Sequence, residues 1–375
     1  VVDYAIWYAG GVSVPVYETS SAEQVRWILS DSEAVGVFLE SHRNKAVFDE
    51  VAVDIPTCTR VWVFDDGIID DLKREGASVS DDELEARRRT VTPDSLATII
   101  YTSGTTGRPK GCVLTQSNLM FEVDNVVVAL QEVFRAPGSS TLLFLPIAHV
   151  FGRLIQLGCI RARARLGHAA DIKDLLPLLA EFQPTFLLAV PRVFEKIYNS
   201  AQQRANADGK GTIFETAANT AIDYSKAKRS GSGGGLGLTI KHAIFDRLVY
   251  RKLRTAMGGQ VRWAVSGGAP LGARLGHFFD GIGVTVLEGY GLTETSAATT
   301  VNRPDAIRIG TVGQPIPGGR VKVAPDGELL LAGGQVFTGY WKNPAATAEA
   351  LDPDGWFHSG DIGEIDDEGF VRITG

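Results

Sequence analysis

A segment rich in glycine and hydroxyl residues has the composition of a loop that binds phosphate groups. It occupies residues 101–111, with the sequence YTSGTTGRPKG, and directly follows an apolar run at 96–100 that predicts a buried strand. Glycines let the backbone approach a ligand closely, and consecutive N–H groups, hydroxyls and Lys110 can then face anionic oxygens. The predicted chemistry is binding of a polyphosphate. The segment is not a Walker A loop, because Gly111 stands where Mg²⁺ coordination in that loop requires serine or threonine.

A second segment could bind a nucleotide base and a metal ion. Residues 288–294, with the sequence EGYGLTE, follow a predicted strand at 284–287, and ligands collect at strand ends in open α/β sheets. The backbone beside the two glycines can approach a flat base, and Tyr290 can stack on it. Glu294 can hold Mg²⁺, which usually takes one or two carboxylates together with phosphate oxygens and waters. For this segment taken alone, a purely structural turn is the alternative.

Three further segments carry candidate binding residues. Asp361 ends the sequence GWFHSGD, and its two carboxylate oxygens could accept both hydroxyls of a ribose; a surface acid is the alternative. Gly268 lies in SGGAP, a sequence that a strand-to-helix turn would also use. His149 lies in LPIAHVFGR, and a lone histidine is more often structural than catalytic. Each segment is ambiguous alone, so the interpretation depends on their occurrence together.

Together, these segments resemble the motifs of the adenylate-forming enzymes, which include acyl-CoA synthetases, luciferases and the adenylation domains of nonribosomal peptide synthetases. The resemblance implies that the loop at 101–111 binds the phosphates of ATP and that Thr102 and Glu294 bind Mg²⁺. It also implies that Tyr290 lies against adenine and that Asp361 binds ribose. The catalytic residues that it implies are Thr102, Lys110, His149 and Glu294. The nucleotide-binding residues that it implies are Ser103, Gly104, Thr105, Thr106, Gly107, Gly268, Glu288, Gly289, Tyr290, Gly291, Thr293 and Asp361.

Two features resemble the long-chain fatty acid–CoA ligase branch of this family. They are the segment at 145–153 and a mostly helical insertion at about 202–259. The resemblance implies that a long-chain fatty acid reacts with ATP to give acyl-AMP and that CoA then takes up the acyl group as a thioester. It also implies that His149 helps to position the acyl group. Arg153 stands where some bacterial members have an aromatic gate to the fatty-acid tunnel, so that gating mechanism is not carried over to this sequence.

Three other functions are alternatives to the ligase. The first is a fatty acyl-AMP ligase, which transfers the acyl group to a carrier protein instead of CoA. It would share these motifs, and the residues that distinguish CoA from a carrier protein would lie in a C-terminal domain. A catalytically silent module that binds nucleotide or lipid is opposed by the intact Thr102, Lys110, Glu294 and Asp361, although these residues do not establish turnover. A P-loop hydrolase is disfavoured because the pair of lysine and serine or threonine is absent.

Composition excludes several other classes of protein. The 375 residues are 44% hydrophobic and 22% charged, as in ordinary globular proteins, and the net charge of −7 argues against a nucleic-acid binder. The three cysteines are too few and too scattered for a disulfide framework or a zinc site, which predicts a reducing compartment. No apolar run reaches the ~18 residues of a membrane span. We therefore expect a cytoplasmic protein; peripheral contact with the inner face of the membrane and the oligomeric state stay open.

The alternation of strands and helices predicts an α/β fold. We expect two packed α/β subdomains with mainly parallel sheets, at residues 1–170 and 171–300, and a small β-barrel-like subdomain at 301–375. Within the first, we expect a strand at 12–16 and a surface connection at 65–90. Both ends of the chain look cut, and the resemblance implies a following C-terminal lid domain that brings a lysine needed for adenylation. We accordingly expect these 375 residues to bind substrates but to catalyse poorly alone.

Overall fold

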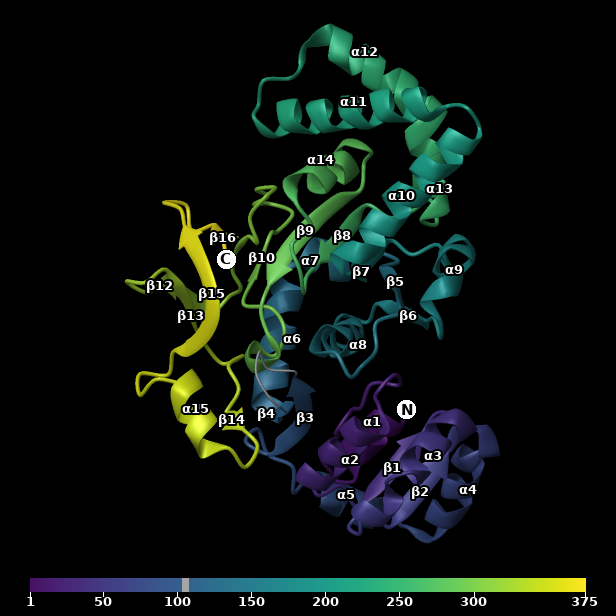
Figure 1. The fold of residues 1–375 in the computed structure, drawn as a ribbon, viewed down its shortest axis with the longest axis vertical. Coiled ribbons are helices and arrows are strands. Elements are labelled where there is room, and N and C mark those ends of the chain that lie inside the picture. The colour runs from purple at the N-terminus through teal and green to yellow at the C-terminus, as the bar shows by residue number, and fades with distance from the viewer. Residues whose placement is uncertain (103–107) are drawn as a thin grey trace.

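The computed structural model describes residues 1–102 and 108–375 and shows an α/β protein built around several small sheets (Figure 1). The strands with parallel neighbours are β1 (Gly36–Leu39), β2 (Arg60–Val63), β5 (Ser140–Leu143), β6 (Arg165–His168), β7 (Phe186–Ala189), β8 (Trp263–Ser266) and β9 (Thr285–Tyr290). β1 pairs with β2, β5 pairs with β6, and β8 lies between β7 and β9. The predicted α/β fold class is confirmed.

The remaining strands pair with antiparallel neighbours, and most of them lie in the last quarter of the chain. They are β3 (Leu96–Thr102), β4 (Lys110–Thr115), β10 (Thr300–Val301), β11 (Gln314–Pro315), β12 (Arg320–Val323), β13 (Glu328–Ala332), β14 (Gly339–Tyr340), β15 (Phe357–Ile365) and β16 (Val371–Ile373). β12, β13, β15 and β16 form a four-stranded sheet where the small β-subdomain was expected. β10 and β11 instead extend the sheet of β7–β9, and β14 joins β3 and β4. The last part of the chain therefore contributes to three separate sheets.

Helices cover the sheets and form most of the long connections. They are α1 (Val2–Tyr8), α2 (Ala22–Asp31), α3 (His42–Asp49), α4 (Ile68–Glu75), α5 (Asp81–Arg88), α6 (Gln116–Ala129), α7 (Gln131–Phe134), α8 (Val150–Ala162), α9 (Leu175–Phe182), α10 (Pro191–Ala207), α11 (Gly211–Arg229), α12 (Gly235–Phe245), α13 (Arg251–Ala256), α14 (Ala273–Gly281) and α15 (Pro344–Ala350). A π-helical turn, η5 (Asp246–Tyr250), joins α12 to α13, and a 3₁₀ turn, η6 (Thr293–Thr295), follows β9. Across residues 1–102 and 108–375, none of the helices combines the length and apolar character needed to cross a bilayer.

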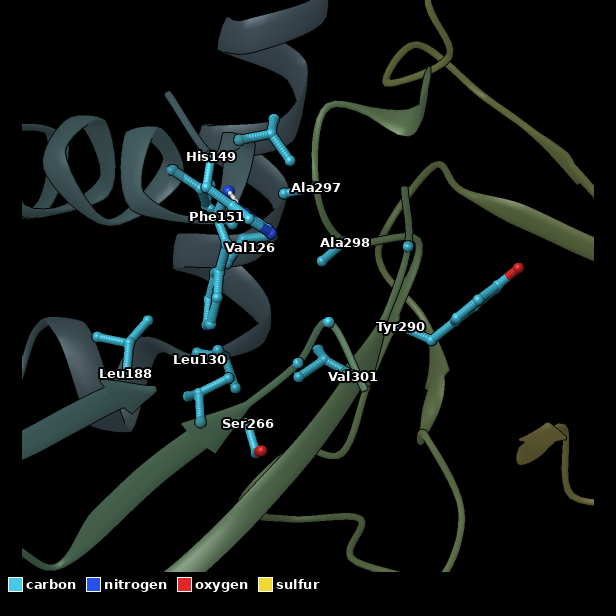
Figure 2. A pocket seen from close by; sticks show the side chains of 17 residues that line it. Val126, Leu130, His149, Phe151, Leu188, Ser266, Tyr290, Ala297, Ala298 and Val301 are labelled. Carbon is cyan, nitrogen blue, oxygen red and sulfur yellow. Dashed lines mark hydrogen bonds between the residues drawn. The ribbon is translucent and has the colours of Figure 1, made fainter. Parts of the chain in front are cut away.

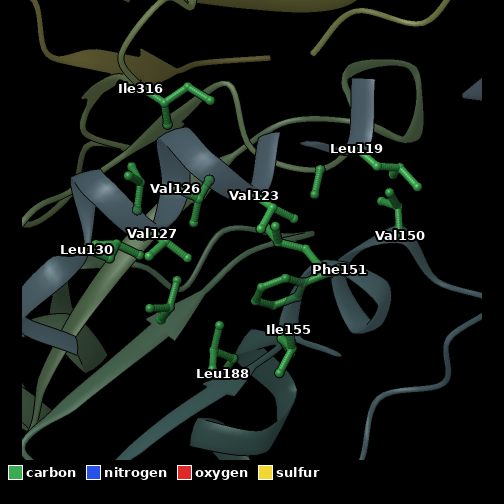
Figure 3. Packing of buried hydrophobic residues seen from close by; sticks show 14 of the residues in the cluster. Leu119, Val123, Val126, Val127, Leu130, Val150, Phe151, Ile155, Leu188 and Ile316 are labelled. Atoms are coloured by element: carbon green, nitrogen blue, oxygen red, sulfur yellow. The ribbon is translucent and has the colours of Figure 1, made fainter. Parts of the chain in front are cut away.

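Two apolar cores hold the larger elements together. In the first, α6 and α8 pack against the ends of β7–β9, with Val127, Phe151 and Leu188 buried between them (Figure 3). In the second, α11 and α14 pack on the other part of the same sheet around Phe194 and Phe279, whose rings are 5.4 Å apart. The carboxyl ends of β8 and β9 thus lie beside the first core.

The structure differs from the sequence prediction in three segments. The strand expected at 12–16 is reduced to one bridge between Ser13 and Thr98, since Pro15 has no N–H to continue a ladder. The connection at 65–90 lies at the surface as expected, but it also contains the helices α4 and α5, whose charged residues face solvent. Residues 110–115, which begin within the predicted phosphate loop, form the strand β4; it was not predicted because its apolar run, at 112–114, is only three residues long.

Candidate active site

The predicted phosphate loop connects two antiparallel strands, and the residues at its ends lie opposite each other. Thr102 is the last residue of β3 and pairs in register with Lys110, the first residue of β4. The Oγ1 of Thr102 is 3.8 Å from the Sγ of Cys112. Five predicted phosphate-binding residues lie outside the described residues: Ser103, Gly104, Thr105, Thr106 and Gly107. The hydroxyl of Thr102 and the ammonium group of Lys110 therefore belong to paired residues where β3 ends and β4 begins.

Tyr340 brings Glu294 and Lys110 together. Its hydroxyl donates a hydrogen bond to Glu294 Oε1 at 2.8 Å, and Lys110 Nζ lies 4.6 Å from the centre of its ring. Burial and the charge of Glu294 raise the pKa of Tyr340, so the hydroxyl stays protonated and keeps its role as donor. Burial, followed by the nearby charge of Glu294, also raises the pKa of the Cys112 thiol. Thr102, Cys112, Glu294, Tyr340 and Lys110 therefore form one contiguous cluster, which we call the Glu294 cluster.

The Glu294 cluster supplies oxygen donors of the kind that Mg²⁺ prefers. The carboxylate of Glu294 and the hydroxyl of Thr102 both lie next to Cys112. Mg²⁺ is usually bound by one or two carboxylates, while phosphate oxygens and waters complete its octahedron. Among the residues that the structure describes, no three His, Cys, Asp or Glu side chains are grouped to hold a metal ion by themselves. The donor set thus fits a Mg²⁺ ion that shares its coordination with a bound phosphate chain.

A second contact joins the predicted adenine and ribose residues. The hydroxyl of Tyr290, the last residue of β9, donates a hydrogen bond to Asp361 Oδ2 on β15 at 2.6 Å. Burial, followed by this bond to Asp361, raises the pKa of Tyr290. The Asp361 backbone N–H donates to Ser359 Oγ at 3.1 Å, which fixes the local course of β15. The pair therefore bridges the sheet of β7–β9 and the four-stranded sheet.

Glycines let two chain segments approach the same space. Gly268 has a φ of +82°, a conformation that residues with a Cβ rarely adopt. A Cβ at Gly291 would lie 1.8 Å from the carbonyl oxygen of Ala297, so this position has no room for a side chain. Gly268, Gly289 and Gly291 all line one pocket beside Tyr290. The segments at the ends of β8 and β9 thus line the same pocket.

Two predicted residues have local structural contacts. The Oε2 of Glu288 accepts a hydrogen bond from the Leu271 backbone N–H at 3.1 Å, and burial raises the pKa of this carboxyl. Glu288 therefore ties β9 to the segment before α14. Thr293 begins the turn η6, which carries Glu294 toward Tyr340. Any nucleotide contact of Glu288 or Thr293 would be additional to these roles.

A small apolar pocket, with a cavity volume of about 50 Å³ and partly open to solvent, lies between α6, α8 and the ends of β7–β9 (Figure 2). Its apolar wall includes Val126, Leu130, Phe151, Leu154, Leu188 and Val301. Figure 2 shows the ring of Tyr290 directed away from Leu130 and Leu188. The site therefore has an apolar compartment on one side of the β9 end and a polar one, with Asp361, on the other.

His149 lies at the edge of this pocket and caps the N-terminus of α8. Its Nδ1 accepts a hydrogen bond from the Phe151 backbone N–H at 3.1 Å. Burial lowers the pKa of the imidazole, which favours the neutral form. A neutral imidazole with an accepting Nδ1 carries its proton on Nε2, so His149 can donate a hydrogen bond to an oxygen atom in the pocket.

Arg153 faces the other side of α8, away from the pocket. Its guanidinium is fully buried and forms a 2.9 Å ion pair with Asp3 of α1, while Ser13 Oγ donates to the same carboxylate at 2.6 Å. The guanidinium also lies 5.2 Å from the centre of the Trp7 ring. Arg153 therefore anchors α8 to the start of the described chain, which is a structural role and not that of an aromatic gate.

Glu122 is a buried acid next to the pocket and should make stability depend on pH. It is 1% exposed; Oε1 accepts from the backbone N–H of Ala298 at 2.7 Å, and Oε2 has no partner in the described structure. Burial raises its pKa well above the usual range. The folded protein therefore holds this proton more tightly than the unfolded chain. Its stabilising contribution is complete below the unfolded pKa and is lost as pH rises through the folded pKa.

We expect Glu122→Gln to stabilise the protein at pH 8 by on the order of 1 kcal/mol, because the amide keeps the acceptor for Ala298 without a titratable proton. Thermal unfolding at pH 5 and pH 8 measures the effect, which should be small at pH 5. Glu132→Gln, at an exposed position of α7, is the matched control and should change neither value. Equal effects of Glu122→Gln at both pH values would contradict this explanation.

Comparison with known proteins identifies the family. A model of the family described as "AMP-binding enzyme" matches residues 1–341. The chain is 52% identical over its whole length to a protein of Mycobacterium bovis named long-chain-fatty-acid–CoA ligase FadD15, and 51% identical to the Mycobacterium tuberculosis protein of the same name. It covers 62% of the length of each of these relatives.

Solved structures show the same fold. A malonyl-CoA ligase in a ternary product complex with methylmalonyl-CoA and AMP covers all of this chain, with a TM-score of 0.69, 27% identity and 68% of its own length matched. The inhibitor-bound N-terminal domain of FACL13 from Mycobacterium tuberculosis matches with a TM-score of 0.70 at 24% identity, over all of this chain and 82% of that domain. These similarities agree with the sequence motifs and with their positions in the structure: the chain belongs to the AMP-binding enzyme family.

Proposed function

We propose that this protein activates long-chain fatty acids with ATP and transfers the acyl group to CoA. The observation that carries the proposal is that three features lie around the end of β9. They are the Glu294 cluster, the Tyr290–Asp361 pair and the apolar pocket. The identity of 52% to a long-chain fatty acid–CoA ligase supports the choice of substrate. Because the chain spans 62% of that relative's length, the complete reaction is assigned to the whole protein.

In the first half-reaction, a carboxylate oxygen of the fatty acid attacks the α-phosphorus of ATP. The bond from the α-phosphorus to the bridging oxygen breaks, pyrophosphate leaves and acyl-AMP forms. Since the substrate itself is the nucleophile, the protein contributes mainly orientation and charge stabilisation. Lys110 contributes positive charge beside the phosphates, and Mg²⁺ held by Glu294 and Thr102 would neutralise further phosphate charge. The carboxylate of Asp361 accepts hydrogen bonds from the ribose hydroxyls, and the ring of Tyr290 lies against the adenine.

The apolar pocket and His149 are assigned to the acyl group. Val126, Leu130 and Phe151 offer the apolar wall that an alkyl chain needs, and burying such a chain releases about 0.8 kcal/mol per CH₂. His149 Nε2 donates a hydrogen bond to an oxygen of the carboxylate or of acyl-AMP. In the second half-reaction, the CoA sulfur attacks the acyl carbonyl carbon, the bond to the phosphate oxygen breaks, and AMP leaves.

Fatty-acid-dependent exchange of labelled pyrophosphate into ATP tests the first half-reaction. With the protein at its full natural length, we expect exchange with palmitate and little with acetate. The reverse preference would contradict the assignment of a long-chain substrate, and nucleotide binding without any exchange would favour a silent binding module. Offering acyl-AMP with either CoA or a carrier protein, and detecting the acyl product by mass spectrometry, distinguishes CoA ligation from carrier loading.

A further inference from the structure

A continuous helical segment in the 202–259 insertion carries apolar side chains on its outer face. α12, η5 and α13 together span residues 235–256 without a break. Four large aliphatic residues recur at every fourth position and are exposed to solvent: Leu236 at 83%, Ile240 at 60%, Ile244 at 53% and Leu248 at 54%. Residues four apart lie on the same face of a helix. We call these four residues the apolar stripe, which extends over ~18 Å at 1.5 Å per residue.

The opposite face of this segment packs against the protein. Rotating the helix to bury the apolar stripe would therefore expose the residues of that face. Phe245 and Val249 pack against the second core. Tyr250 is fully buried and its hydroxyl donates a hydrogen bond to the Ala217 carbonyl oxygen at 2.7 Å. The His242 Nε2 lies 2.6 Å from the carbonyl oxygen of Gly281, in α14. The segment therefore has two apolar faces, of which one is used by the fold.

Basic residues accompany the apolar stripe on the exposed side. They are Lys241, Arg247, Arg251 and Lys252, all of which are exposed. Residues 224–260, all within the described structure, contain eight lysines and arginines and one acidic residue, Asp246, although the whole chain has a net charge of −7. Asp246 forms an ion pair with Arg254 at 2.7 Å, and its side chain is 33% exposed. The outer face thus concentrates positive charge beside aliphatic side chains.

Position in the molecule also leaves this face accessible. α11 lies between α12 and α14, and α12 is the outermost helix at the upper end of the view in Figure 1. The α3 and α4 region lies at the opposite end of the molecule. A flat surface could therefore approach α12 without meeting the rest of the described chain at that end.

We propose that the outer face of residues 235–256 binds the surface of a membrane that contains anionic lipids. Amphipathic helices of this composition lie parallel to the bilayer, with aliphatic side chains among the acyl chains and lysine and arginine near the headgroups. A second copy of the chain is a poorer occupant, because two such faces would bring like charges together. Nucleic acid would use the basic residues but not the apolar stripe. The inference rests on this surface alone and does not require the proposed ligase reaction.

Vesicle co-sedimentation tests the proposal. The purified chain is mixed with vesicles of phosphatidylcholine alone or of phosphatidylcholine with phosphatidylglycerol, at low and high salt. We expect binding to the mixed vesicles that decreases with salt, and much weaker binding to phosphatidylcholine alone. Ile240→Ser/Ile244→Ser and Arg247→Gln/Arg251→Gln should each weaken binding to the mixed vesicles at least about tenfold.

Two matched controls remove the same side-chain types at the opposite end of the molecule. Val35→Ser/Val53→Ser removes two valines that are 74% and 87% exposed, and Arg43→Gln/Arg60→Gln removes two exposed arginines; neither should alter binding. Circular dichroism and thermal unfolding confirm that every variant folds. The proposal is overturned if the folded parent does not bind mixed vesicles, or if the stripe and control variants behave alike. It is also overturned if the parent forms a dimer through this face, or binds duplex DNA here, without binding vesicles.

Discussion

Replacing Glu294 with glutamine is expected to weaken binding of ATP in the presence of Mg²⁺ at least about tenfold, or ~1.4 kcal/mol, while metal-free binding changes little. The glutamine keeps an oxygen that can accept the 2.8 Å hydrogen bond from Tyr340, so the geometry of the Glu294 cluster is preserved. It removes the negative charge that a divalent cation requires from its ligand. Titration calorimetry with ATP, with and without Mg²⁺, measures the difference.

Tyr340→Phe is the matched control for this prediction. It removes the hydroxyl that bonds to Glu294 but leaves the carboxylate charge and the aromatic ring beside Lys110. We expect a smaller loss of affinity than in Glu294→Gln. If Glu294→Gln weakens binding equally with and without Mg²⁺, its role in holding the metal is wrong. A loss of thermal stability as large in Glu294→Gln as in a core substitution would mean that the cluster is structural.

The largest stability effect is expected at the buried ion pair between α1 and α8. Asp3→Asn leaves the Arg153 guanidinium, which is 0% exposed, without a counter-charge, and breaking such a pair typically costs about 3–5 kcal/mol. We expect a large decrease in the urea midpoint of the unfolding phase that includes α8. The double variant Asp3→Asn/Arg153→Met should recover much of this loss, because no uncompensated charge is then buried.

Asp124→Asn is the control for the ion-pair prediction. Asp124 pairs with Arg161, also on α8, but both side chains are about half exposed, at 44% and 50%. Exposed pairs contribute about 0–1 kcal/mol, so this variant should unfold nearly as the parent does. Equal destabilisation by Asp3→Asn and Asp124→Asn would show that burial of Arg153 does not govern the stability of this contact.

The sequence predicted the parts of the site that depend on local backbone chemistry. Glycine is expected where the backbone has a positive φ or no room for a side chain: Gly268 has a φ of +82°, and a Cβ at Gly291 would lie 1.8 Å from the carbonyl oxygen of Ala297. The approach of these glycines to a base stays a prediction. Proline is favoured in the first turn of a helix, where its missing N–H is not needed, and α10 begins at Pro191. Such features are encoded within a few residues because they depend on steric limits of the backbone.

Contacts between distant segments could not be predicted in the same way. Asp3 and Arg153 are 150 residues apart, and spacing gives no sign of their pairing. Tyr340 was not identified as a site residue, although its position directly after Gly339 and before Trp341 was a weak signal for an aromatic residue beside a turn. The side chain of Glu288 was predicted from its motif alone, whereas its hydrogen bond to Leu271 depends on how α14 packs beside β9. These contacts arise from packing of whole elements.

The measurement that tests the central claim most directly is isothermal titration of the protein with a non-hydrolysable palmitoyl-adenylate mimic. The parent is compared with Asp361→Ala, with Tyr290→Phe, which removes only the hydroxyl bonded to Asp361, and with the exposed control Asp367→Ala. We predict that the parent and Asp367→Ala bind the mimic alike, that Tyr290→Phe binds somewhat less tightly, and that Asp361→Ala loses more than about tenfold in affinity. Unchanged affinity in Asp361→Ala, or no binding by the folded parent, would contradict the claim that an acyl-adenylate lies between the apolar pocket and Asp361.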